Sequence, residues 1–203
     1  MKLVLLVEGH SEKQGVGPFL KRWLDKRLTR PIGIQPMRFH GWGDLLRELP
    51  EHAQRILHGP KSQKIAAVVA LLDLYGPTYP SSVTSATRRY EWLKTTYEQS
   101  VGDERFRLFA AVHEIEAWLL AQPDVFPPAI QKSLPRKKPE SINFDTPPSK
   151  LLNQIYQKQT RRRYKKLADG TQLFAKLDPD RVYERCPRFA AMMDEILALL
   201  RER

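Results

Sequence analysis

Residues 65–73 read Ile65-Ala66-Ala67-Val68-Val69-Ala70-Leu71-Leu72-Asp73. The run before Asp73 is apolar throughout instead of alternating, which is typical of a strand covered on both faces in a parallel sheet. Residues 3–7 and 106–112 are two further apolar runs with strand character. Residues 33–39 are a weaker fourth candidate, in which Pro36 favours the edge of the sheet because proline cannot donate a ladder hydrogen bond.

Helical patterns occupy residues 11–28, 44–57 and 84–97, between these strands. Ser11 followed by Gln14 fits a capping box at the start of the first helix. Strands that alternate with helices imply right-handed crossovers. We therefore predict an α/β fold with an open, mainly parallel sheet of about four strands flanked by helices, within residues 1–121.

The chain changes character after residue 121. Seven prolines punctuate an irregular connection, at positions 123, 127, 128, 135, 139, 147 and 148, and residues 149–167 and 188–201 follow as predicted helices. Residues 122–203 are expected to form a basic helical extension that packs on the core instead of folding alone, because their apolar residues look few.

Composition describes a soluble globular protein, with 41% hydrophobic and 28% charged residues in a chain of 203. Cys186 is the only cysteine, which excludes an internal disulfide and fits a reducing cytoplasm. The apolar opening is too short for a signal peptide, and no run is long enough to span a membrane. We expect a cytoplasmic protein that binds no membrane, and the oligomeric state stays open.

The net charge of +11 is uneven, since residues 121–203 hold 17 basic and 10 acidic residues. Such a surplus attracts polyanions, of which nucleic acid is the commonest in a cytoplasm, although solubility alone is the simpler explanation.

An acid follows each of the three best strands: Glu8, Asp73 and Glu114. Because the carboxyl ends of parallel strands share one edge of the sheet, these three side chains should converge. Clustered carboxylates repel each other unless a cation bridges them, and hard oxygen ligands suit Mg²⁺ or Mn²⁺. Glu12 and Glu116 are possible further ligands.

Structural explanations compete for Glu12, Asp73 and Glu116, whereas Glu8 has little stabilising purpose between a strand and Gly9. Glu12 suits the positive end of a helix, Asp73 suits the opening of a turn, and Glu116 suits an exposed first helical turn. The coincidence of three acids at strand ends carries more weight than any one of them.

Four stretches resemble a known group. Leu6-Val7-Glu8-Gly9-His10-Ser11-Glu12 resembles the opening motif of Toprim domains, the catalytic fold of topoisomerases, primases and the OLD nucleases. The closer resemblance is to the Toprim-like bacterial domain-of-unknown-function family 4276. Three further stretches carry it: residues 72–76, residues 112–120, and residues 146–150 taken together with 185–189.

The resemblance implies a Toprim-like fold in which Glu8 is a metal ligand or general acid/base and Asp73 is the first acid of an Asp-x-Asp element. Tyr75 stands where that element has its second acid, so Glu114 or Glu116 is expected to supply the missing charge. The group also looks like a companion of ATPases in bacterial or phage-defence gene clusters.

Other side chains have two interpretations each. His10 and His113 flank the acids and either position water or phosphate or are hydrogen-bonded structural residues. Ser149 and Lys150 either bind phosphate or begin a helix. A basic run on the predicted helix 149–167 either tracks a phosphate backbone, with Tyr164 stacked on a base, or is a solvated face. That run comprises Arg161, Arg162, Arg163, Lys165 and Lys166.

Two functions fit these observations. The first is a Mg²⁺- or Mn²⁺-dependent nuclease with Glu8, Asp73 and Glu114 as catalytic residues and Gly9, His10, His113 and Tyr75 in support. The second is a Toprim-shaped subunit that binds an ATPase or nucleic acid without cleaving. The chain has no Gly-x-x-x-x-Gly-Lys-Ser/Thr loop, so any ATP hydrolysis must come from a separately encoded partner.

Overall fold

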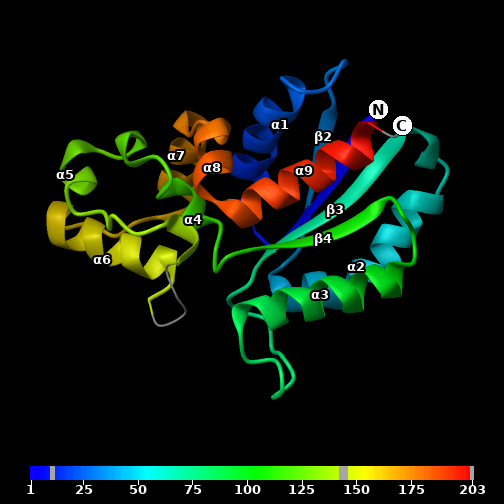
Figure 1. The fold of residues 1–203 in the computed structure, drawn as a ribbon, viewed down its shortest axis with the longest axis horizontal. Helices are drawn as coiled ribbons and strands as arrows, with labels where there is room; N and C mark the ends of the chain where they lie inside the picture. Colours follow the sequence, from blue (N-terminus) through cyan, green and yellow to red (C-terminus); the bar gives the residue numbers. More distant parts are fainter. Residues whose placement is uncertain (10–11, 142–145, 202–203) are drawn as a thin grey trace.

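Four strands form one sheet in this computed structural model, which describes residues 1–9, 12–141 and 146–201 (Figure 1). They are β1 (Lys2–Val7), β2 (Gly33–Arg38), β3 (Ile65–Asp73) and β4 (Phe106–Ala111), all parallel, in the order β2-β1-β3-β4. The predicted α/β fold class is confirmed. Each predicted strand lies within one residue of its observed ends, and Pro36 lies in an edge strand as expected.

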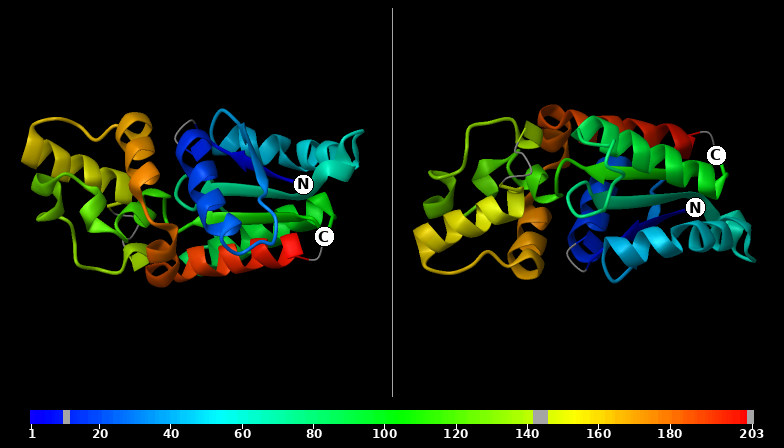
Figure 2. Two further views of the ribbon diagram at one scale, coloured as in Figure 1. Left: turned by 90° about the horizontal axis from the view of Figure 1, so that it is seen from above. Right: turned by 90° about the horizontal axis from the view of Figure 1, so that it is seen from below.

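Helices cover both faces of the sheet (Figure 2). Leu3, Leu5 and Val7 of β1 join one core with α1 (Gly17–Asp25) and α9 (Pro187–Arg201). Val4 and Leu6 join another with α2 (Trp42–His58) and α3 (Ala86–Val101). Residues of β3 alternate between the two cores in the same way. Burial on both sides explains why this strand carries no polar alternation.

The helices between the strands match their patterns with one exception. The patterns at 44–57 and 84–97 correspond to α2 and α3, and Ser85 caps α3 by accepting a hydrogen bond from the Arg88 amide. The pattern at 11–28 is instead a π-helical turn, Glu12–Val16, followed by the shorter α1. The predicted cap Ser11 lies outside the described residues.

The remaining elements lie mainly in the extension. They are α4 (Glu116–Leu119), α5 (Pro128–Gln131), α6 (Pro148–Thr160), a π-helical turn (Lys166–Gly170), α7 (Thr171–Lys176) and α8 (Pro179–Arg185), with 3-10 turns at Ser62–Lys64, Pro123–Val125 and Pro139–Ser141. Figure 2 shows α5, α6 and α7 gathered beyond one end of the sheet, opposite the two termini, while α9 runs back along the sheet. Each parallel strand finishes at the end that faces α5, α6 and α7.

The predicted helix 149–167 is wrong after Thr160. It ends at Thr160 because Arg161 adopts a left-handed conformation with φ of 55°. That turn brings the Tyr164 ring to 5.5 Å from the Tyr156 ring, whereas residues eight apart on a continuous helix are separated by about 12 Å along its axis. The basic run from Arg161 to Lys165 therefore lies off the helix.

The extension also buries more apolar side chains than its composition suggests. Helix α9 packs against β3 and β4 and contributes seven buried apolar side chains: Phe189, Met192, Met193, Ile196, Leu197, Leu199 and Leu200. In the described part of the chain, no helix is both long and apolar enough to cross a bilayer.

Candidate metal centre

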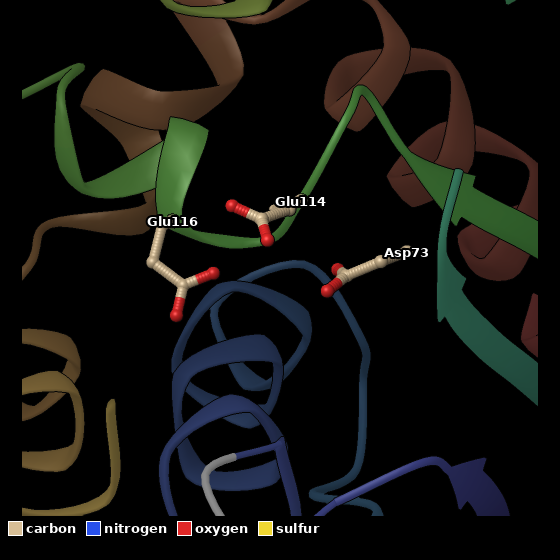
Figure 3. A group of neighbouring side chains, drawn as sticks. All are labelled: Asp73, Glu114 and Glu116. Atoms are coloured by element: carbon tan, nitrogen blue, oxygen red, sulfur yellow. The ribbon is translucent and has the colours of Figure 1, made fainter. Parts of the chain in front are cut away.

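Three carboxylates converge where the central strands finish (Figure 3). Asp73 is the last residue of β3, Glu114 lies between β4 and α4, and Glu116 is the first residue of α4. One oxygen from each lies within 4.8 Å of the others. Each residue is nearly inaccessible, with exposed fractions of 8% for Asp73, 5% for Glu114 and 1% for Glu116.

The ammonium group of Lys166 lies against all three acids. Its Nζ is 3.8 Å from Asp73 Oδ2, 3.5 Å from Glu114 Oε1 and 3.3 Å from Glu116 Oε2. These ion pairs offset one of three negative charges, so the group of four side chains carries a formal charge of −2 when the acids are ionised. Buried like charges are costly, and a divalent cation would neutralise this remainder.

Backbone and side-chain donors orient two of the acids. Asp73 Oδ1 accepts a hydrogen bond of 2.9 Å from the Ile115 amide. Glu114 accepts two bonds from Ser149 in the first turn of α6, one of 2.7 Å from the amide and one of 2.9 Å from the hydroxyl. These bonds orient the carboxylates before any ligand arrives. All ligand atoms are hard oxygens, so the residues present fit Mg²⁺ or Mn²⁺.

Glu8 lies beside this group but is not one of its three members. The half-buried carboxylate of Glu8 accepts a 2.6 Å hydrogen bond from the Asp73 amide, across the neighbouring strands β1 and β3. The shared edge of the sheet therefore brings Glu8 and Asp73 together, as the strand ends predicted.

A model of the family described as "Domain of unknown function (DUF4276)" matches residues 7–197. The chain belongs to the DUF4276 family. The predicted family is thereby confirmed, and the match includes every acid named above.

Two solved structures are similar to this DUF4276 domain. One is the C-terminal region of the OLD protein of Xanthomonas campestris pv. campestris, with 17% identity over 98% of this chain and 94% of that one, and a TM-score of 0.45. The other is the C-terminal region of the Burkholderia pseudomallei OLD protein, with 18% identity over 98% and 96%, and a TM-score of 0.46. No curated protein matches the chain.

The structural explanation for Glu116 fails in this DUF4276 domain. Glu116 is not an exposed first-turn acid, because only 1% of the residue is accessible. Asp73 directly precedes the bends at residues 74–77, and its carboxylate also accepts from the Ile115 amide on the segment that follows β4.

Other predicted residues have mixed positions. His10 and the Glu12 side chain lie outside the part that the structure describes. Gly9 follows Glu8, and its carbonyl accepts a bond from the Lys13 amide. His113 is 6% exposed, and burial together with the charge of Arg89 lowers the pKa of its imidazole, with Glu114 opposing that shift.

The predicted nucleic-acid residues divide into two sets. Lys166 points into the acids, and Arg162 pairs with Asp169 at 2.8 and 3.0 Å. The remaining side chains are exposed: Lys150, Arg161, Arg163 and Lys165. The Tyr164 ring is not positioned to stack on a base, because only 8% of the residue is accessible and the ring packs on Tyr156.

Sequence reasoning missed two features of the site. It treated Ser149 as a possible cap or phosphate ligand, whereas Ser149 donates to Glu114 from α6, whose N-cap position is Pro147. It also treated Lys166 as one member of a basic run. No sequence signal distinguishes Lys166 from its neighbours, because its role follows from the turn at Arg161 and the π-helical turn after it.

Proposed function

We propose that this DUF4276 domain hydrolyses phosphodiester bonds in nucleic acid with Mg²⁺ or Mn²⁺ held by Asp73, Glu114 and Glu116. The observation that carries the proposal is the group of three buried carboxylates within 4.8 Å, which keeps a formal charge of −2 beside Lys166. Three ionised carboxylates are expensive to bury without a strong counter-charge, and stability alone does not require them at the end of a sheet.

Each residue has a role in this proposal. A divalent cation at the acids supplies Lewis-acid polarisation of a phosphate oxygen and lowers the pKa of a bound water. Glu8 lies beside Asp73 and accepts the proton of the attacking water on its carboxylate. Lys166 is 41% exposed, so its side chain has room to turn from the acids and donate to a phosphate oxygen.

The exposed basic residues support nucleic acid as the polymer. Three of these residues, Arg161, Arg163 and Lys165, lie in the same segment as Lys166, whose ammonium group contacts the acids. Cations at such positions raise the local concentration of a polyanion and hold its backbone near the carboxylates.

A second candidate is a subunit that binds a separately encoded ATPase or nucleic acid without cleaving. It is favoured by the ion pairs of Lys166, which already give each acid a partner, and by Tyr75 at the position of the second acid of the Asp-x-Asp element. If an ATPase gene lies beside the gene for this chain, that would support control by an ATPase for either candidate function.

The test is a cleavage assay with single-stranded DNA, duplex DNA and tRNA in Mg²⁺, Mn²⁺ or EDTA. Asp73→Asn, Glu116→Gln and Glu8→Gln are compared with Glu91→Gln, which changes an exposed acid on α3 in the same way. We expect metal-dependent cleavage by the wild type and by Glu91→Gln, and a loss of at least about 100-fold in the other variants. Cleavage that survives Asp73→Asn and Glu116→Gln would place the activity elsewhere.

A further inference from the structure

Two of the exposed large apolar residues lie close in sequence to members of the acidic group. Among the described residues, those with substantial exposure are Met1, Tyr75 and Leu167, at 59%, 46% and 47%. Met1 is at the chain end, whereas Tyr75 is two residues after Asp73 and Leu167 directly follows Lys166. Single exposed apolar residues are ordinary, but two that lie within two residues of members of one candidate site point to a ligand with an apolar surface.

The backbone fixes the position of Tyr75. Its amide donates a 2.9 Å bond to the carbonyl of His113, next to Glu114. The following Gly76 has a φ of +132°, and a Cβ there would lie 3.1 Å from Trp42 Cδ1. Beyond it, the Tyr79 hydroxyl donates a 2.9 Å bond to the Leu74 carbonyl. Tyr75 therefore lies in an ordered turn, which holds its side chain in an exposed position.

The surroundings of the two side chains determine which part of a nucleic acid they meet. Phosphates are attracted to a cation at the carboxylates and to the exposed Arg163 and Lys165, which lie just before Leu167. The ring face of a tyrosine or an aliphatic side chain gains little from a phosphate but gains from contact with the face of a base. The bases on either side of the scissile phosphate are therefore the groups that Tyr75 and Leu167 would contact.

We infer that Tyr75 and Leu167 contact unstacked bases, so that the substrate of the proposed phosphodiesterase is a single-stranded or locally unpaired nucleic acid. The inference rests on the proposed function for the position of the phosphate. In a duplex each base face is covered by its neighbours, and a side chain reaches that face only after unpairing or unstacking. A single strand presents its base faces at no such cost.

The test is a binding measurement in which no bond is broken. Fluorescence anisotropy follows labelled single strands of DNA and of RNA, and the matching DNA duplex, with Ca²⁺ in place of Mg²⁺. We expect single strands to bind at least about tenfold more tightly than the duplex. Tyr75→Ala and Leu167→Ala should each weaken single-strand binding by about three- to tenfold, whereas Tyr75→Phe, which keeps the ring, binds like the wild type.

The outcomes separate this inference from the proposed function. Equal binding of duplex and single strand, or equal binding by Tyr75→Ala and Tyr75→Phe at unchanged melting temperature, would overturn the inference. Cleavage of duplexes that is indifferent to Tyr75 would overturn it too, while leaving the phosphodiesterase intact. Tyr75-dependent binding of single strands without any metal-dependent cleavage would support the inference as a binding mode and refute the phosphodiesterase.

Discussion

Lys166 is the residue that decides how the acids behave without metal. Its ammonium lies 3.3 to 3.8 Å from an oxygen of each acid and competes for the position that a cation would take. Removal of this charge leaves three buried carboxylates less compensated, but strengthens their attraction for a divalent ion.

We therefore expect Lys166→Met to lower the free energy of unfolding in EDTA by about 1–3 kcal/mol, a value reduced because the lysine is partly exposed. The same variant should bind Mn²⁺ about tenfold more tightly. Urea unfolding and titration calorimetry measure the two effects, and Lys61→Met, at an exposed lysine before β3, is the control. Unchanged stability together with unchanged affinity would show that Lys166 does not act as the counter-ion.

Asp103 is a second residue with a measurable charge effect. Its Oδ1 accepts from Arg105 Nε at 3.0 Å and its Oδ2 accepts from Nη2 at 2.7 Å, and its side chain is only 8% exposed. These hydrogen bonds hold the pKa of the Asp103 carboxyl below its ordinary value. A lowered folded-state pKa contributes stability above the unfolded pKa, and this contribution is lost as the pH falls through the folded value.

Asp103→Asn should accordingly destabilise the protein by about 1–2 kcal/mol at neutral pH. The difference from the wild type should begin to shrink below about pH 4, where the unfolded carboxyl takes up its proton. Denaturant unfolding at pH 7 and at pH 3 measures both values. A difference of the same size at the two pH values would exclude this electrostatic origin.

At the scale of elements, α6 is attached to the sheet through Glu114. Ser149, in the first turn of α6, donates both its amide and its hydroxyl to that carboxylate. Loss of one hydrogen bond to a charged group costs about 1.5–3 kcal/mol. We expect Ser149→Ala to lower the free energy of unfolding by this amount and Ser149→Thr to retain most of it, as measured by urea unfolding. Equal stability of the two variants would mean that the hydroxyl does not hold the helix.

The elements also show which parts of the structure a sequence can predict. The strands were predictable because burial on both faces leaves a continuous apolar run, and the strand-end acids because parallel strands finish at one edge. The end of α6 at Thr160 was not, since it depends on Tyr164 packing against a ring from the preceding helix. The position of Lys166 in the site was unpredictable for the same reason, because it follows from the turn after Thr160.

For the whole molecule, the core and the extension share one aromatic cluster. The Phe19 ring lies 6.2 Å from Trp118, and 5.5 Å from both Phe174 and Phe189. The first two rings belong to residues 1–121 and the other two to residues 122–203. Aromatic side chains bury large areas, so their exposure is costly.

We expect a fragment of residues 1–121 to lack a cooperative thermal transition, because removal of α7 and α9 exposes Phe19 and Trp118. Circular dichroism and differential scanning calorimetry of the fragment and the full chain make the comparison. A fragment that unfolds cooperatively near the melting temperature of the full chain would show that residues 1–121 fold independently.

The most direct test of the metal centre is calorimetric titration of the protein with Mn²⁺ and with Mg²⁺. We expect at least one divalent ion to bind, and Asp73→Asn and Glu116→Gln each to weaken binding by about tenfold or more, while Glu91→Gln leaves binding unchanged. Binding that is absent from the folded wild type, or equally strong in all three variants, would contradict a metal centre at these carboxylates.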